Sequence, residues 1–285
     1  MSNEKQDLEP LDWGRLAHGF NDMPPVTPLQ MAKVRADSFN KSEGDLNQKD
    51  GHDCRLCRNK GYTLEVFEEN GNVYTKSVPC KCMPTRRSIM LMKASGLENQ
   101  MKQCRFETFE TKKDWQKEVK DQAMEYASNP DGWFFFGGQS GAGKTHLCTA
   151  ICRQLLLDGN EVRYMLWRDE INKLKSMVNS DEYQREIEKY KTVPVLYIDD
   201  LFKTGMAPSV EYAQRPTSAD INIAFEILNN RYNNKLKTII SSECTLNELL
   251  DIDEAIAGRI AENKYVISIS KDTSRNYRLR NMRRQ

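Results

Sequence analysis

Long hydrophobic runs are absent from this sequence of 285 residues. None of its apolar stretches approaches the roughly 20 residues that a helix needs to span a bilayer. The first residues also lack the basic-then-apolar pattern of a secretory signal. We therefore expect a protein without a membrane partner and with a cytoplasmic location.

An excess of one charge is absent as well. The 42 Lys and Arg residues face 41 Asp and Glu residues, so the overall charge argues neither for nor against nucleic acid as a partner. We find no internal repeat and no extended low-complexity tract. Charged residues make up 29% and hydrophobic residues 39% of the chain, an ordinary balance for a globular protein. The length suffices for one α/β domain plus a smaller module.

A phosphate-binding signature stands near the middle of the chain. Residues 138–145 read Gly-Gln-Ser-Gly-Ala-Gly-Lys-Thr, a Walker A motif between a strand pattern and a helical pattern. Its glycines let backbone amides approach phosphate oxygens, and the N-terminus of the next helix adds partial positive charge. Lys144 is expected to neutralise the β- and γ-phosphates of ATP, and Thr145 to offer its hydroxyl to Mg²⁺. The predicted nucleotide-binding residues are Gly138, Gln139, Ser140, Gly141, Ala142, Gly143, Lys144, Thr145 and His146, although we assign His146 no chemistry of its own.

An acidic strand end follows about 50 residues past this motif. Residues 195–200 read Val-Leu-Tyr-Ile-Asp-Asp. Asp199 is expected to hold the Mg²⁺ shell, directly or through water, and Asp200 to orient or deprotonate the attacking water. Lys144, Asp199 and Asp200 are therefore candidate catalytic residues, with ATP and Mg²⁺ as cofactors.

Strand-like apolar runs alternate with helical patterns from about residue 104 onward. The runs cover 133–136, 162–167, 193–198, 237–242 and 265–269, and the helical patterns cover 114–127, 144–157, 169–178, a segment capped by Ser218, and one that begins with a capping box of Thr245 and Glu248. Strands separated by helices imply an α/β fold in which a parallel sheet has helices on both faces.

Four cysteines form two close pairs, with the spacing C-x₂-C-x₂₂-C-x-C: Cys54, Cys57, Cys80 and Cys82. Between the pairs lie two β-rich runs, 62–67 and 72–78, joined by an Asn-Gly turn that predicts a hairpin. Two thiol pairs at the base of a hairpin favour a structural Zn²⁺ with four sulfur ligands. The alternatives are four unrelated or redox-active thiols, or an iron–sulfur cluster.

The remaining patterns suggest three domains. Residues 1–51 form a polar segment with one short helix at 29–39 and a linker from residue 42. Residues 52–103 form the zinc-binding module and a connecting helix at 86–103. Residues 104–285 form the ATPase domain.

Several motifs together resemble AAA+ helicase loaders of the DnaC/DnaI type, which are common in bacteria and their phages. They are the Walker A motif, the acidic strand with its continuation to Lys203, residues 238–243 (Thr-Ile-Ile-Ser-Ser-Glu), residues 258–260 (Gly-Arg-Ile) and residues 276–279 (Asn-Tyr-Arg-Leu). The resemblance covers residues 52–280, because a cysteine module also precedes the ATPase domain in the DnaI type.

The resemblance implies roles for further residues. Arg259 matches the arginine finger that reaches the γ-phosphate of a neighbouring subunit, so hydrolysis would depend on self-association through the ATPase domain. Ser242 and Glu243 match the sensor 1 position, where many relatives carry Asn. Arg275 and Arg278 are candidates for sensor 2. Where AAA+ proteins commonly carry Glu, this chain has the shorter Asp200. Phe106 and Phe109 match aromatics that line an adenine pocket, and core packing accounts for them equally well.

The resemblance also implies partners: the hexameric replicative DNA helicase and single-stranded DNA. Residues 271–285 hold six basic residues against one acidic residue, a pattern typical of a segment that follows a phosphate backbone or of a solvated terminus. Two other functions stay open. One is a transposition helper ATPase of the IstB type, which the ATPase part resembles nearly as well. The other is a regulatory nucleotide-binding protein that never turns over ATP.

Overall fold

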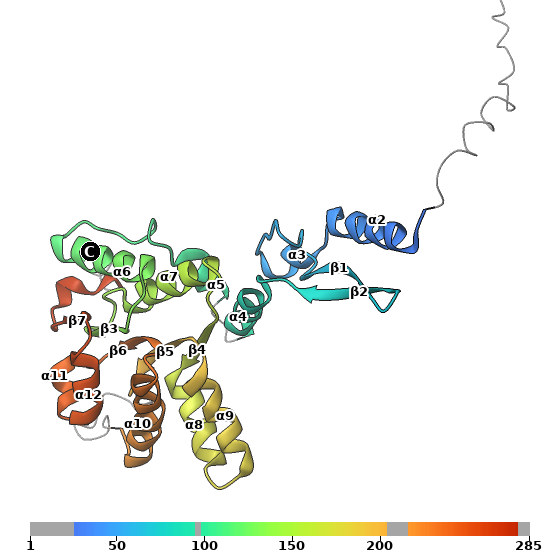
Figure 1. Ribbon diagram of the computed structural model, residues 1–285. Coiled ribbons are helices and arrows are strands. Elements are labelled where there is room, and N and C mark those ends of the chain that lie inside the picture. The colour runs from blue at the N-terminus through green and yellow to red at the C-terminus, as the bar shows by residue number, and fades with distance from the viewer. Residues whose placement is uncertain (1–25, 95–97, 204–215, 279–285) are drawn as a thin grey trace, which may run out of the picture. The chain divides into compact units, whose positions relative to one another are not determined.

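The computed structural model describes residues 26–94, 98–203 and 216–278 (Figure 1). These residues divide into two compact units, with the boundary between Cys80 and Lys81. Within the described ranges, no helix is both long enough and apolar enough to cross a bilayer.

The first unit is built on a β-hairpin. Strands β1 (Tyr62–Glu69) and β2 (Asn72–Pro79) pair antiparallel along their whole length. At the turn, Asn70 and Gly71 both have positive φ (51° and 76°), which matches the twist of the strands and confirms the predicted hairpin. Helix α2 (Pro28–Lys41) packs on β1, where the Asn40 amide exchanges two hydrogen bonds with the backbone of Leu64.

One expectation for this unit is wrong. The stretch that we expected to be a linker contains a short helix, α3 (Leu46–Asp50). Gly51 ends this helix in the left-handed conformation (φ 75°), where a glycine costs least. The early proline-rich part of the first predicted domain lies outside the described residues.

The second unit alternates helices and strands. Its elements in chain order are α4 (Met83–Ala94), α5 (Glu98–Gln103), α6 (Asp114–Ser128), β3 (Trp133–Gly138), α7 (Lys144–Leu157), β4 (Val162–Leu166), α8 (Trp167–Met177), α9 (Asp181–Thr192), β5 (Val195–Leu201), α10 (Ser218–Asn233), β6 (Lys237–Ser242), α11 (Leu246–Leu250), α12 (Glu254–Ala261), β7 (Tyr265–Ile269) and the 3₁₀ turn η1 (Thr273–Arg275).

The five strands of this unit form one parallel sheet in the order β4-β5-β6-β3-β7. After β3 the chain crosses to β4 at one edge of the sheet. It then returns strand by strand, through β5 and β6 and past β3, to β7 at the other edge. Because parallel crossovers are right-handed, this reversal puts α7 on one face and α8 to α12 on the other, as Figure 1 shows. Ligands of such sheets bind where the direction reverses, beyond the carboxyl ends of the strands. In this protein that place is the end of β3.

Each face of the sheet has its own hydrophobic core. Phe134 and Phe136 of β3 face the core under α6 and α7, and the alternating residues Trp133 and Phe135 face the core under α8 to α12. All four are buried. The predicted α/β fold with a parallel sheet between two helical layers is confirmed.

Three local predictions differ from the structure. Helix α9 was not predicted, the cap of α10 is Thr217 and not Ser218, and the expected connecting helix is two helices, α4 and α5, on either side of residues outside the description. Helix α4 packs on β4 and α7, where the Ser88 hydroxyl accepts a hydrogen bond from the Val162 N–H (2.9 Å). The three domain limits themselves stay a prediction.

Candidate nucleotide-binding site

The phosphate loop joins the end of β3 to the start of α7. Gly138, Gly141 and Gly143 all have positive φ (99°, 74° and 89°), a conformation that side chains disfavour. A Cβ on Gly141 would lie 2.1 Å from the Asn276 Oδ1, and one on Gly143 would lie 2.6 Å from the Phe109 ring. The loop is therefore shaped so that only glycine fits, and it leads into the N-terminus of α7, where an anion binds favourably.

Lys144 lies under this loop. Its ammonium donates hydrogen bonds to the carbonyl oxygens of Gly138 (2.8 Å) and Gln139 (3.0 Å), and its side chain also lines a cavity of about 360 Å³. Burial lowers the pKa of Lys144, although the carboxylates of Glu243 and Asp200 act in the opposite direction. A cation held in a poorly hydrated place has much to gain from an anionic ligand.

Asp199 is held by hydroxyl groups. Its buried carboxylate accepts hydrogen bonds from Thr145 (3.3 Å), Tyr164 (3.1 Å) and Tyr197 (2.8 Å), and also from Ser241. The two residues predicted to serve Mg²⁺, Thr145 and Asp199, are thus direct neighbours. Burial, reinforced by the charge of Asp199, raises the pKa of both tyrosines, which keeps them protonated as donors.

Three of these hydroxyl donors were not among the predicted site residues: Tyr164, Tyr197 and Ser241. Tyr197 could have been found, because it lies two positions before Asp199 and shares its side of β5. Tyr164 and Ser241 lie on the neighbouring strands β4 and β6, and sequence spacing does not say which strands are neighbours.

Asp200 stands where β5 loses its regular pairing with β6, in a register shift between Ile198 and Leu201. Its φ is positive (57°), as is that of Phe202 (62°), which is uncommon away from glycine. The Lys203 ammonium lies 2.9 Å from the Asp200 carboxylate and 3.0 Å from the Glu243 carboxylate. Lys203 was not among the predicted site residues.

The end of β6 presents two residues that match the sensor 1 position. Ser242 is buried and donates its hydroxyl to the carbonyl of Leu201 (2.8 Å), whereas Glu243 lines the cavity. Burial raises the pKa of Glu243, but hydrogen bonding and charge from Lys203 outweigh it, so that the net shift is downward. Glu243 is therefore an anion in the cavity wall.

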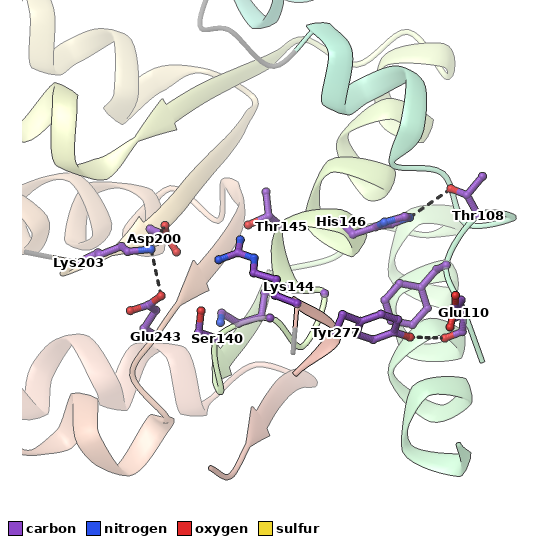
Figure 2. Close-up of a pocket in the computed structure, with 14 residues that line it drawn as sticks. Thr108, Glu110, Ser140, Lys144, Thr145, His146, Asp200, Lys203, Glu243 and Tyr277 are labelled. Atoms are coloured by element: carbon purple, nitrogen blue, oxygen red, sulfur yellow. Dashed lines mark hydrogen bonds and ion pairs between the residues drawn. The ribbon is translucent and has the colours of Figure 1, made fainter. Parts of the chain in front are cut away.

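Figure 2 shows the cavity from end to end. Lys203, Asp200 and Glu243 lie at one end, Lys144 and Thr145 in the middle, and Tyr277, Glu110 and Thr108 at the other end. The volume suits a small organic ligand.

Aromatic rings line the end away from Asp200 and Glu243. Phe109 belongs to the core under α6 and α7 and also lines the cavity, whereas Phe106 packs against that core and is not among the lining residues. The His146 ring stands edge-on to Phe109 (5.4 Å between centroids). The Tyr277 N–H donates to the carbonyl of Gly141 (2.9 Å), so the C-terminal segment is attached to the phosphate loop.

The two candidates for sensor 2 differ in position. Arg278 lines the cavity. Arg275 instead donates to the hydroxyl of Ser270 (2.9 Å). Residues beyond Arg278, with three of the six basic residues of the segment 271–285, lie outside the described residues.

Arg259 lies on α12 and does not line the cavity of its own chain. Its guanidinium donates to the Asn229 amide oxygen (2.7 Å) and to the carbonyl of Ala255 (2.8 Å), and it lies over the ring of Phe225 (5.0 Å to the centroid). Any contact of Arg259 with a nucleotide would therefore need the cavity of a neighbouring copy.

The four predicted cysteines come together. The Sγ atoms of Cys54, Cys57, Cys80 and Cys82 lie within 4.8 Å of one another, and all four residues are buried. A tetrahedral zinc site with Zn–S bonds of about 2.3 Å puts its sulfur atoms about 3.8 Å apart, and the Sγ atoms of Cys54 and Cys80 are 3.7 Å apart. Two N–H groups also point at sulfur: the Gly61 amide at Cys57 and the Arg86 guanidinium at Cys82. The cluster fits a structural metal ion.

A parallel sheet with a phosphate loop at the end of β3 and an acidic strand end beside it defines a P-loop nucleotide-binding protein. The profile of the IstB-like ATP binding protein family matches residues 81–284, and the chain belongs to that family. In the crystal structure of the DnaC helicase loader, 97% of the chain superimposes on 59% of this one, with a TM-score of 0.50 and 21% identity. The fold is thus of the AAA+ type.

The relatives by sequence include a protein of a phage-like element. The chain is 33% identical to the uncharacterized protein YqaM of Bacillus subtilis, over 72% of this chain and 67% of YqaM. It is 31% identical to the phage-like element PBSX protein XkdC of Bacillus subtilis, over 74% of this chain and 79% of XkdC. It is 30% identical to the replicative helicase loader DnaC of Escherichia coli, over 38% of this chain and 46% of DnaC. The protein is thus a DnaC- and IstB-like ATP-binding protein related to helicase loaders.

Proposed function

We propose that this protein is an ATPase that loads the replicative DNA helicase onto single-stranded DNA during replication initiation. The observation that carries the ATPase part is that Lys144, Thr145 and Asp200 line one cavity, with the Asp199 carboxylate hydrogen-bonded to Thr145 directly behind it. The loader part is supported by the similarity to DnaC and by the cysteine cluster, three of whose four members precede residue 81, where the match to the family profile begins.

In this proposal the predicted nucleotide-binding and catalytic residues have the following roles. The loop residues 138–146 bind the phosphates through their amides, and Lys144 neutralises the β- and γ-phosphates. Thr145 and Asp199 would hold Mg²⁺, which would offset the negative charge of the phosphates. Asp200 orients the attacking water or takes its proton. The hydroxyl groups around Asp199 keep its carboxylate turned toward Thr145.

The cysteine module has a structural role in the proposal. Cys54, Cys57, Cys80 and Cys82 bind Zn²⁺, and because four sulfur ligands complete the tetrahedron, no position is left for a reactive water. We further propose that residues 1–51, 52–103 and 104–285 are the three domains, and that the zinc-binding domain contacts the helicase.

Replacing Arg259 by Ala is expected to preserve ATP binding and to remove ATP turnover. The reason is that Arg259 is absent from its own cavity and would supply its positive charge to the γ-phosphate bound by a neighbouring copy; such arginines contribute roughly 10³-fold or more to the rate. The measurement is steady-state phosphate release at several protein concentrations, together with the Kd for ATP. An unchanged rate would refute the assignment of Arg259 as an arginine finger.

Capture of the purified hexameric replicative helicase tests the loader proposal. The baits are the full chain and a chain that begins at Lys81 with Cys82 replaced by Ser, which retains α4 and its packing on β4. We expect ATP-dependent capture by the full chain and none by the shortened one. No capture by either bait, when both are folded and bind ATP, would contradict helicase loading.

That negative result would favour the second candidate, a transposition helper ATPase, because the family profile carries the IstB description. Phosphate release with and without single-stranded DNA separates both from a regulatory protein that binds nucleotide and never hydrolyses it.

A further inference from the structure

Two acidic side chains face the place where we propose that phosphates bind. Asp200 and Glu243 both line the cavity beside Lys144 and Thr145, and Figure 2 shows them on the same side of Lys144. A polyphosphate brought next to two carboxylates is repelled by them. A site that binds ATP at this place therefore needs a cation to offset that repulsion at the acidic end.

Lys203 is the cation at that end. Its ammonium lies between the two carboxylates, at 2.9 Å from Asp200 and 3.0 Å from Glu243, and the residue lines the same cavity. Lys144 forms no comparable ion pair with Asp200 or Glu243, because its ammonium is hydrogen-bonded to the carbonyl groups of the phosphate loop.

The backbone fixes this position. The Lys203 N–H donates to the carbonyl of Asp200 (2.9 Å), which closes a tight turn at the end of β5. Asp200 and Phe202 both take left-handed φ angles in this turn. Strained, non-glycine conformations of this kind persist where the surrounding structure requires them, and they gather at functional sites. The turn directs Lys203 back to the cavity instead of continuing the strand.

We propose that Lys203 distinguishes a nucleoside triphosphate from a diphosphate. In the structure the Lys203 ammonium contacts both Asp200 and Glu243. When a triphosphate binds, the Lys203 ammonium moves to the terminal phosphate. The Asp200 carboxylate then becomes available to a water molecule. A diphosphate lacks the group that Lys203 would reach and leaves the lysine with the two acids. This inference rests on the proposed binding of ATP.

The exchange is physically easy. The side chain of Lys203 is 37% exposed, and ion pairs with this exposure contribute little to stability. An ammonium also has three N–H groups and a flexible stem, so that it can reach a phosphate oxygen while it keeps one of the two carboxylates.

The test compares the Kd values for Mg·ATP and Mg·ADP, measured by titration calorimetry on the full chain. Lys203→Met is expected to weaken ATP binding about tenfold, the effect of losing one hydrogen bond between charged groups. ADP binding should weaken by a smaller factor, because the two unpaired acids repel either nucleotide but only the triphosphate also loses a partner for its terminal phosphate. Lys203→Arg should retain most of the preference for ATP. Glu243→Gln should strengthen the preference, because one competitor for the ammonium is removed.

Lys173→Met is the matched control. Lys173 also contacts two carboxylates, Glu170 (3.8 Å) and Glu186 (3.2 Å), and it does not line the cavity. Its loss should leave both Kd values unchanged. Equal changes for ATP and ADP in Lys203→Met, or no change in either, would overturn the inference. If Lys203→Met were unfolded by its melting curve, an unaltered preference in Glu243→Gln would overturn it instead. Wild-type protein that binds neither nucleotide would refute the proposed function itself.

Discussion

Replacing Lys144 by Ala is expected to abolish the binding of ATP. In the structure the ammonium of Lys144 lies under the phosphate loop, 2.8 Å from the carbonyl of Gly138, and burial lowers its pKa. Its charge is therefore poorly hydrated in the empty site and is best stabilised by a phosphate. Loss of this contact removes a charge-assisted interaction worth about 1.5–3 kcal/mol and also leaves the loop carbonyls without their donor.

Titration calorimetry with Mg·ATP checks this prediction, with the melting temperature of each variant measured in parallel. Lys144→Met is a second variant that keeps most of the apolar stem. Lys264→Ala serves as a control, since Lys264 pairs with Glu125 on the surface (2.6 Å). Undiminished binding of ATP by both Lys144 variants would contradict a phosphate site at residues 138–146.

Much of the fold could be predicted because its periodic patterns are long. Helix α7 and strands β6 and β7 begin and end as the sequence patterns indicate. Helix α9 was overlooked although its buried residues recur at helical spacing, at Tyr183, Ile187 and Tyr190. Its many charged residues conceal this apolar stripe.

The candidate site could be predicted only in part, because motifs are local and the cavity is not. The phosphate loop and Asp199 stand in contiguous motifs. Lys203 meets Glu243 only because a turn with two left-handed residues ends β5 and because β6 is the neighbouring strand. Tyr164 reaches Asp199 because β4 is the other neighbouring strand of β5. Such contacts depend on strand order and on local backbone conformation, neither of which a single sequence states.

Removal of the proposed zinc ion is expected to unfold the first unit while ATP binding by the second persists. The hairpin has no hydrophobic core of its own, since no residue of β1 or β2 is fully buried. The buried apolar side chains of the described part of this unit are the cysteines Cys54, Cys57 and Cys80 and the single Ala36. A unit of this size needs another source of stability, and structural Zn²⁺ supplies about 10–16 kcal/mol of apparent binding free energy.

The measurement combines metal content by mass spectrometry with limited proteolysis of the hairpin. Wild-type protein should contain one zinc ion per chain and resist cleavage. Cys57→Ser, which changes a fully buried ligand, should lose the metal and expose the hairpin to protease. Cys104→Ser, a change outside the cluster, should do neither.

A metal-free wild-type protein with a protected hairpin would contradict the zinc assignment. An isolated two-stranded hairpin is marginal in water, so its stability would then rest on the packing of α2 on β1 and on the exposed pair of Phe67 and Tyr74, stacked at 5.5 Å. Retained ATP binding in Cys57→Ser is the other half of the prediction. ATP binding should persist because the four thiolates would fill the coordination shell of the zinc ion, so that the ion takes no part in phosphate transfer.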